Sequence, residues 1–269
     1  PERTRAVLAN QGIDYIALAT VNMTGKVELT GLNMELDVAE MRDTWFKSSY
    51  LLDKKQSGEK LAAARFENYK SQPISYSFNS KWEGTFDSFS LNPYRKEKSG
   101  KTAAIIREKG VNGDREMAYS LWLAGFDVKD VHMTDLIAGR ETLEDVQMIV
   151  FVGGFSNSDV LGSAKGWAGA FLYNEKAKQA LDNFYARKDT LSLGVCNGCQ
   201  LMVELGLITP EHDVKPKMLH NESHKFESAF VNVTIPQNET VMFKSLEGQR
   251  LGVWIAHGEG KFSLPKSLS

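Results

Sequence analysis

From residue 101 onward, short apolar runs alternate with stretches in which apolar residues recur at helical spacing. The runs predict strands and the spaced positions predict helices. Strands that alternate with helices favour a parallel sheet covered on both faces, so an α/β fold is expected here. Two later β segments are expected to extend that sheet. The predicted strands are 102–107, 126–131, 148–152, 191–195, 230–235 and 251–256, and the predicted helices are 114–124, capped by Asp114, 164–173, 175–187 and 199–205.

The first hundred residues show a different pattern. Two β-like runs, 15–21 and 27–32, flank a turn at 23–26 and predict a small hairpin. Asp37 is a candidate N-cap for a helix over 38–55, and a charged, helical stretch continues over 54–69.

The predicted elements divide the chain into three parts. Residues 70–100 are polar, contain Pro73 and Pro93, and predict an irregular connector. We therefore expect a small β region at 1–36, a helical and irregular linker at 37–100, and the α/β domain at 101–269. The chain opens on proline and ends directly after a strand-like segment, so we expect it to be a fragment.

Composition and charge exclude several classes of protein. The 269 residues are 42% hydrophobic and 25% charged, as in an ordinary globular protein. A formal charge of −2 argues against a general nucleic-acid binder. No apolar run is long enough to span a bilayer, and the first residues lack the hydrophobic core of a signal peptide. We expect a cytoplasmic protein that contacts neither nucleic acid nor membrane.

The segment from Gly194 to Gln200 carries the strongest chemical signal. It joins a predicted buried strand to a predicted helix, and a cysteine on so sharp a turn is held out of the sheet. Gly194 and Gly198 let the backbone turn tightly and let the helix approach closely. A helix N-terminus also favours a thiolate. The pattern predicts a nucleophile elbow with Cys196 as nucleophile, against the alternative of a buried structural cysteine.

The spacing of Cys196 and Cys199 also fits a redox or zinc site. A structural zinc site needs two further good ligands, and neither a second CxxC nor a spaced histidine pair lies near. Thioredoxin-like motifs stand near the start of their domain, unlike this pair. We therefore expect no metal site.

Acyl transfer through a thiolate also requires oxyanion donors and a base. The backbone N–H of Asn197, at the helix start, is one natural donor. A second is expected from the polar loop 153–159, where glycines let N–H groups point into a pocket, although an ordinary turn would read the same way. Of the five histidines, His257 alone has a carboxylate two residues on, Glu259, so spacing nominates this pair as base and orienting group.

Several segments together resemble a known family. Gly194-x-Cys196-x-Gly198-x-Gln200 resembles the nucleophile motif of class I, triad-type glutamine amidotransferases, whose domain is flavodoxin-like. The longer run 194–200 is similar to the large single-chain phosphoribosylformylglycinamidine synthases. The further segments that agree are 107–112, 125–127 with 131–133, 153–156, 159–162 with 166–167, 221–227 and 257–260. The resemblance covers 101–269 almost continuously and implies that these residues are a glutaminase domain, truncated at its C-terminus. It covers 1–100 less specifically, and there it implies the end of a synthetase domain at 1–36 and a linker at 37–100.

The resemblance implies a function for each site. Cys196 would attack glutamine and release ammonia, while Asn197 with Gly153, Gly154 and Phe155 would form the oxyanion hole. The expected partners are L-glutamine and a synthetase region of the same polypeptide, which would use ATP and Mg2+; no cofactor is expected in these residues. The remaining candidates, which would line the glutamine pocket, are Gln200, Asn112, His257 and Glu259.

The resemblance also changes the expected role of His257. The family draws its triad histidine and glutamate from a later His-Pro-Glu segment, and this sequence contains none. We therefore expect the base beyond Ser269 and the isolated chain to be inactive or nearly so. Two alternatives stay open: a protease-like or chaperone-like relative with the same elbow, and a non-catalytic docking module.

Overall fold

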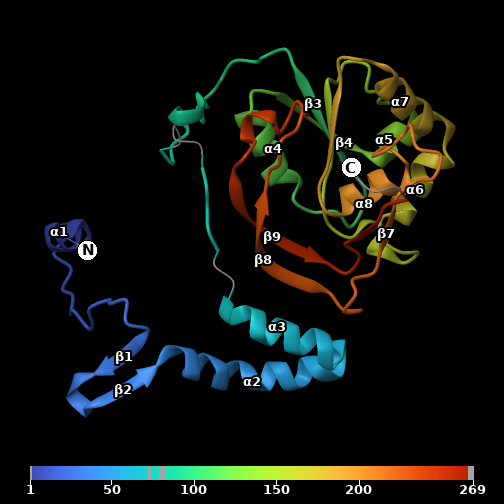
Figure 1. Ribbon diagram of the computed structural model, residues 1–269. Coiled ribbons are helices and arrows are strands. Elements are labelled where there is room, and N and C mark those ends of the chain that lie inside the picture. Colours follow the sequence, from blue (N-terminus) through green and yellow to red (C-terminus); the bar gives the residue numbers. More distant parts are fainter. Residues whose placement is uncertain (1, 72–73, 79–82, 266–269) are drawn as a thin grey trace. The chain divides into compact units, whose positions relative to one another are not determined.

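The computed structural model describes residues 2–71, 74–78 and 83–265, which form two compact units, Pro1–Gln72 and Pro73–Ser269 (Figure 1). None of the helices in the described part of the chain is both long and apolar enough to cross a membrane. The first unit contains α1 (Glu2–Asn10), β1 (Lys26–Leu29), η1 (Thr30–Leu32), β2 (Met34–Asp37), α2 (Val38–Ser57) and α3 (Glu59–Ser71).

Asp37 begins the longest helix of the first unit. Its carboxylate accepts the backbone N–H groups of Ala39 and Glu40 at 2.8 and 3.0 Å, as an N-cap does. The predicted cap is confirmed. The helical stretch predicted over 54–69 is interrupted, because Gly58, at φ 83°, separates α2 from α3.

The predicted hairpin forms one strand later in the chain than expected. Residues 15–21 make no strand, and β1 pairs antiparallel with β2, with Lys26 opposite Asp37. The turn lies at 30–33, where Asn33 takes a left-handed conformation at φ 48°. The apolar run at 15–21 predicted a strand wrongly because no described residue covers it: Leu18 is 92% exposed. The helix α1 was not predicted.

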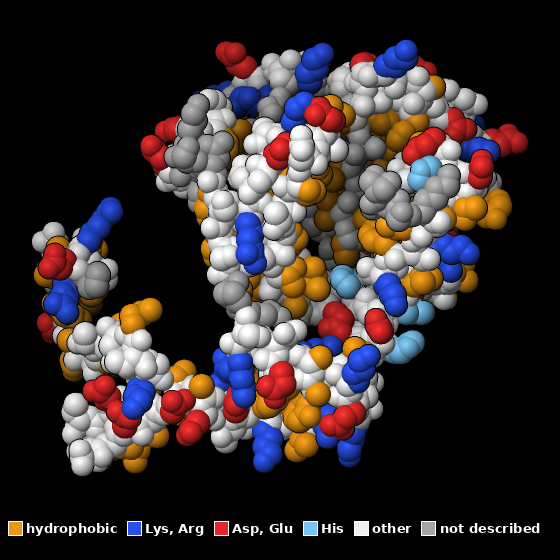
Figure 2. Space-filling view, in the orientation of Figure 1, with side chains coloured by type: hydrophobic (Ala, Val, Ile, Leu, Met, Phe, Trp, Pro, Cys, Tyr) orange, Lys and Arg blue, Asp and Glu red, His pale blue; other side chains and the backbone are white. Residues whose placement is uncertain are grey.

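The first unit buries little of its own apolar surface. Only Asp53 and Ala62 are buried among its described residues, whereas Trp45 on α2 is 81% exposed. Figure 2 shows orange hydrophobic side chains among the charges on the segment labelled α2 and α3 in Figure 1.

The second unit is built on a four-stranded sheet with the order β4-β3-β5-β6, parallel throughout. This order is that of a flavodoxin-like sheet. The elements of this unit are η2 (Asp87–Phe89), β3 (Thr102–Arg107), α4 (Asp114–Leu123), β4 (Asp127–His132), α5 (Met133–Ala138), β5 (Met148–Phe151), η3 (Ser156–Asp159), α6 (Lys165–Leu172), α7 (Glu175–Ala186), β6 (Leu191–Gly194), α8 (Asn197–Glu204), β7 (Lys217–Leu219), β8 (Glu227–Thr234), η4 (Lys244–Leu246), β9 (Arg250–His257) and β10 (Lys261–Ser263).

Alternate residues of the strands face two separate apolar cores. On one face, Ile106 and Phe151 pack with Trp167 and other residues of α5, α6, α7 and α8. On the other, Ile105 and Val150 lie in a smaller cluster with α4. Figure 1 shows α4 on one side of the strands and the other four helices on the opposite side. The expected parallel sheet with both faces covered is confirmed.

Three expectations for this unit are wrong in detail. The strands β8 and β9 pair antiparallel with each other in a separate two-stranded sheet and do not extend the parallel one. Their apolar alternation identified strands, but alternation cannot identify a strand's partner. Asp114 is the first residue of α4, and Gly113, at φ 76°, takes the cap position without a side-chain bond. The predicted start of α8 at Cys199 was two residues late.

Candidate functional site

The nine predicted site residues lie on the loops that follow β3 and β5, on the turn and the first helical residues that follow β6, and at or just after the end of β9. Cys196 stands between the end of β6 at Gly194 and the start of α8 at Asn197, and it is exposed. Its backbone takes φ 51° and ψ −109°, a conformation that non-glycine residues rarely adopt. The strained strand-to-helix turn predicted for the elbow is therefore confirmed.

Two glycines allow this turn because no side chain would fit at either position. A Cβ on Gly194 would lie 2.6 Å from the carbonyl oxygen of Gly198 and 2.7 Å from the sulfur of Met202. A Cβ on Gly198 would overlap the carbonyl group of Phe151 on the neighbouring strand. The close approach of α8 to the sheet, expected from the sequence, thus depends on both glycines.

The loop after β5 lies directly beside the cysteine. A Cβ built on Gly153 would lie 3.2 Å from the Cβ of Cys196. This loop is held to the loop after β3 by three backbone bonds. Asn112 N–H donates to the carbonyl of Gly153 at 2.8 Å, and Phe155 N–H donates to the carbonyl of Gly110 at 2.9 Å. The third runs from Asn157 N–H to the carbonyl of Lys109 at 2.9 Å. Asn112 therefore reaches the site through its backbone.

The backbone N–H groups differ in their availability. That of Phe155 is already donated, as just described. Those of Gly153, Gly154 and Asn197 have no acceptor among the described residues. The N–H groups of Gly154, on the loop after β5, and of Asn197, on the elbow itself, are therefore free to bind a negatively charged oxygen.

A run of strained backbone follows the glycine loop. Asn157, Ser158 and Asp159 all take left-handed conformations, with φ 51°, 57° and 48°. The side chain of Asn197, fully buried, contacts both ends of this run: its Oδ1 accepts the N–H of Ser156 at 3.0 Å, and its Nδ2 donates to Asp159 at 3.2 Å. Strained backbone persists only where its surroundings hold it, and here the elbow helix does so.

The end of β9 forms the opposite side of the site. The thiol of Cys196 lies 3.7 Å from the carbonyl oxygen of Ala256. The buried amide of Gln200 donates through Nε2 to the carbonyl of Glu259 at 2.7 Å, and its Oε1 accepts from Asn197 Nδ2 at 2.9 Å. The four sequence segments predicted to form the site, around residues 112, 153–155, 196–200 and 257–259, are thus brought together.

His257 and Glu259 do not act on each other in the way their spacing suggested. The Nδ1 of His257 lies 2.9 Å from Oδ1 of Asn221, whereas the carboxylate of Glu259 lies 3.6 Å from Nδ1 of His220. A general base needs a group that orients its ring, and the carboxylate nominated for that role faces another histidine. The base-and-carboxylate pair inferred from spacing is therefore wrong, although both residues remain beside the elbow.

Asn221 is a buried residue that was not nominated for the site. Its Oδ1 accepts the N–H of Gly260 at 3.1 Å, and its Nδ2 donates to the carbonyls of Lys225 and His257 at 3.0 and 2.7 Å. It therefore holds the 257–260 loop in place. The sequence places Asn221 in a segment that resembles the family, but its hydrogen bonds join residues far apart in the chain.

The second cysteine of the pair differs from the first in its surroundings. Both are free thiols, but Cys199 is partly buried. Burial, with a smaller contribution from the neighbouring Cys196, raises the pKa of the Cys199 thiol. Cys199 is accordingly a poor nucleophile at neutral pH. Among the described residues, no three His, Cys, Asp or Glu side chains gather in a way that could hold a metal ion.

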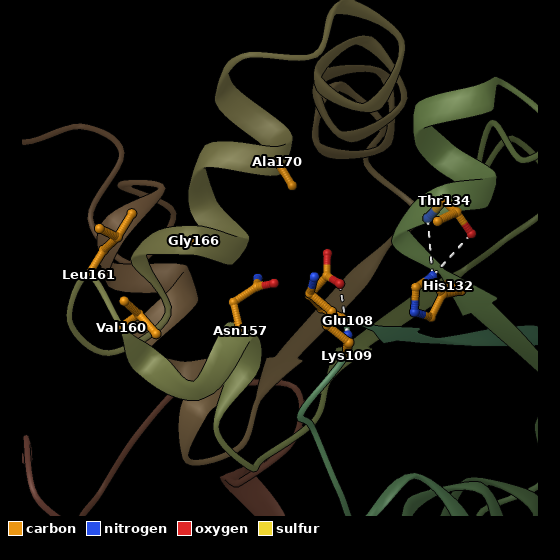
Figure 3. A pocket seen from close by; sticks show the side chains of 9 residues that line it. All are labelled: Glu108, Lys109, His132, Thr134, Asn157, Val160, Leu161, Gly166 and Ala170. Atoms are coloured by element: carbon orange, nitrogen blue, oxygen red, sulfur yellow. Dashed lines mark hydrogen bonds between the residues drawn. The ribbon is translucent and has the colours of Figure 1, made fainter.

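A cavity of about 540 Å³ lies on the other side of the strained run, and Cys196 is not part of its lining (Figure 3). Asn157 reaches it from the strained run, Glu108 and Lys109 from the loop after β3, and His132 from the end of β4. The ring of His132 is engaged in a local contact, since Nδ1 accepts the N–H of Thr134 at 3.2 Å. The cavity is thus separate from the elbow and shares only a loop with it.

Comparison with curated proteins finds relatives that are named phosphoribosylformylglycinamidine synthase. The chain is 42% identical over 233 residues to the probable phosphoribosylformylglycinamidine synthase, chloroplastic/mitochondrial, of Arabidopsis thaliana, which covers 84% of this chain and 16% of that protein. It is 39% identical over 267 residues to phosphoribosylformylglycinamidine synthase of Homo sapiens, covering 93% and 19%. The chain thus spans less than a fifth of the length of these two relatives.

Solved structures and a family model give the remaining similarities. PurLQS from Thermotoga maritima aligns with a TM-score of 0.49 and 27% identity, over 61% of this chain and 69% of that one. A glutamine amidotransferase from the same organism aligns with a TM-score of 0.41 and 17% identity, over 62% and 64%. The family model of the CobB/CobQ-like glutamine amidotransferase domain matches residues 101–268. With the strained cysteine elbow already in place, this match over most of the chain shows that the protein belongs to the CobB/CobQ-like glutamine amidotransferase family.

Proposed function

We propose that residues 101–269 are the glutaminase portion of a phosphoribosylformylglycinamidine synthase. In this proposal L-glutamine is hydrolysed at Cys196, and the ammonia serves a synthetase region of the same polypeptide. That region would convert formylglycinamide ribonucleotide to its amidine with ATP and Mg2+. The name shared by relatives at 36–42% identity supports this assignment.

The observation that carries the proposal is the elbow itself. An exposed thiol stands at a strained turn beside the loop after β5, and the N–H groups of Gly154 and Asn197 have no acceptor among the described residues. The thiolate would attack the side-chain carbonyl carbon of glutamine, and the two N–H groups would bind the oxyanion that forms. Collapse of this intermediate breaks the C–N bond, and the leaving nitrogen takes up a proton to become ammonia. Water then hydrolyses the thioester, which yields glutamate and restores the thiol.

The other predicted residues fit around that reaction. Gln200, held by Glu259 and Asn197, would lie close to the bound glutamine. His257, whose ring contacts Asn221, would line the pocket and would not serve as the base. Phe155 would shape the loop, since its own N–H is bonded to Gly110.

The test uses 6-diazo-5-oxo-norleucine, a glutamine mimic that alkylates the nucleophile. We expect saturable labelling of Cys196 in the natural polypeptide that carries these residues, located by mass spectrometry of peptides. Cys196→Ser should abolish labelling and glutamine hydrolysis, whereas the matched variant Cys199→Ser should retain both. Label that persists in Cys196→Ser, or that falls on Cys199, would defeat the assignment.

A further inference from the structure

The side chain of Asn197 is the point at which the segments around the elbow are joined. It is completely buried, and its amide makes three hydrogen bonds, to Ser156 N–H, to Asp159 and to Gln200. One oxygen acceptor and both donor positions are used. A buried amide with three of its four hydrogen-bonding positions in use holds each of its partners in place.

The hydrogen bonds continue beyond Asn197 on both sides. Asp159 Oδ1 also accepts the N–H of Ala164, just before α6, at 3.2 Å. Gln200 passes the connection to the carbonyl of Glu259 at 2.7 Å. One relay therefore links the start of α6, the strained run 157–159, the elbow helix and the loop after β9.

The strained run needs such a restraint. Three consecutive non-glycine residues with positive φ would relax if they were released, because each left-handed conformation is unfavourable for an L-residue. Relaxation would also move Gly154, three residues before the run, whose N–H is one of the two proposed oxyanion donors. The side chain of Asn197 can prevent this movement because it bonds to Ser156 and Asp159. The backbone N–H of the same residue is the other proposed oxyanion donor.

We propose that the Asn197 side chain is a positioning residue for glutamine hydrolysis. It holds the 153–159 loop against the elbow, so that the N–H groups of Gly154 and Asn197 point together at the oxyanion. The inference rests on the proposed function of Cys196. It assigns to the side chain a role separate from that of the Asn197 backbone.

The test compares two substitutions of Asn197 in the natural polypeptide. Asn197→Ala removes every arm of the tether. Asn197→Asp keeps the acceptor for Ser156 but turns a carboxylate oxygen toward the oxygens of Asp159 and Gln200. Loss of one oxyanion donor costs a factor of about 100–1000 in turnover, so a misplaced donor should cost roughly 10–100-fold. We expect that fall in kcat and in the maximal rate of labelling by 6-diazo-5-oxo-norleucine.

Other rates should change much less, and this separates positioning from general damage. Gln200 keeps its bond to Glu259, so we expect KM for glutamine to change less than about threefold. Alkylation of Cys196 by iodoacetamide, which needs no oxyanion hole, should stay within about twofold. The matched control is Asn174→Ala, which removes the N-cap bond to Ala177 at the start of α7, away from the elbow, and should leave kcat unchanged.

A second substitution at the other end of the tether provides a rescue. Asp159→Asn in the Asn197→Asp background restores a donor opposite the new carboxylate, and kcat should recover several-fold. If Asn197→Ala does not fold, Asp159→Ala removes one arm of the tether, together with the bond from Ala164 N–H, and should still lower kcat more than KM. Unchanged kcat in these variants, or equal losses in kcat and in iodoacetamide reactivity, would overturn the inference. Failure of the proposed function is recognised differently, by unsaturable or absent labelling of Cys196 in the unsubstituted protein.

Discussion

At the scale of single residues, the elbow stores backbone strain that packing must hold. A non-glycine residue in a rarely populated conformation costs about 1–3 kcal/mol, and Cys196 takes φ 51°. Gly198 makes this possible by bringing α8 against the carbonyl of Phe151. The thiol of Cys196 is exposed at the turn because α8 packs closely against the sheet. A substitution that alters this packing therefore also alters the site.

Gly198→Ala should therefore destabilise the domain. A Cβ there overlaps main-chain atoms of β5, which cannot move without disturbing the sheet, and overpacking costs about 1–3 kcal/mol. The measurement is the free energy of unfolding in urea. Gly169→Ala in α6 is the matched control, because its Cβ would meet only Tyr173, at 3.7 Å, and should stabilise by about 0.5–1 kcal/mol. Equal effects of the two substitutions would contradict the packing argument.

The residues of the site were predictable to the extent that local sequence determines them. The elbow is set by two glycines and a strand-to-helix change within seven positions of the chain, 194–200. The partners of Glu259 and of His257 are His220 and Asn221, which lie on another segment of the chain. Spacing paired His257 with Glu259, and the fold separated them.

At the scale of elements, Asp127 connects the start of β4 to the irregular connector. Its carboxylate accepts the N–H groups of Ser99 and Gly100 at 3.1 and 2.9 Å and pairs with Arg95 at 3.2 Å. Burial alone would raise the pKa of this carboxyl. The two N–H groups and the guanidinium outweigh burial, so the pKa lies below its ordinary value.

The lowered pKa of Asp127 determines how the free energy of unfolding depends on pH. The contribution of the ionised Asp127 is present above the ordinary aspartate pKa of about 3.9 and is lost as pH falls through the lower, folded-state pKa. Asp127→Asn should lower the free energy of unfolding at pH 7 and should make it fall less steeply between pH 5 and pH 3. Urea unfolding at several pH values measures both effects. Parallel curves for the two proteins would show that the carboxylate does not contribute through its charge.

The sequence predicted an element correctly where the apolar pattern of its own residues matches the surfaces that it buries. It could not predict whether another segment covers that element or pairs with it. The strand β3 sends alternate residues into two cores, so a continuous apolar run marked it correctly. The run at 15–21 is also mostly apolar, but no described residue covers it, and it forms no strand. For β8 and β9 the pattern gave the strands but not which sheet they join.

At the scale of the whole molecule, the two units differ in what can hold them folded. The second unit has two apolar cores, whereas only Asp53 and Ala62 are buried in the described part of the first. Stability scales with buried apolar surface, so the units should not unfold together.

Amide hydrogen exchange on the intact chain should show this difference. We expect the protection factors of backbone amides in α2 and α3 to be lower than those in β3 and β5 by a factor of at least about 100. The reason is that opening of α2 and α3 exposes little apolar surface. Exchange of β3 and β5 should follow the main unfolding transition in urea. Equal protection in both units would show that surface buried between parts of the chain stabilises the first.

The three hydrogen bonds of the Asn197 side chain also protect this residue from deamidation. Asn197 is followed by Gly198, and an asparagine before glycine readily loses its amide when the glycine nitrogen attacks the side-chain carbon. In the folded protein the N–H of Gly198 is donated to the carbonyl of Val195 at 2.9 Å, and the amide is fixed by three partners. The attacking nitrogen and its target are both held in other bonds. The fold therefore shields the elbow from slow deamidation. A molecule that unfolds even briefly exposes an asparagine whose conversion to aspartate would place a carboxylate oxygen against the oxygens of Asp159 and Gln200.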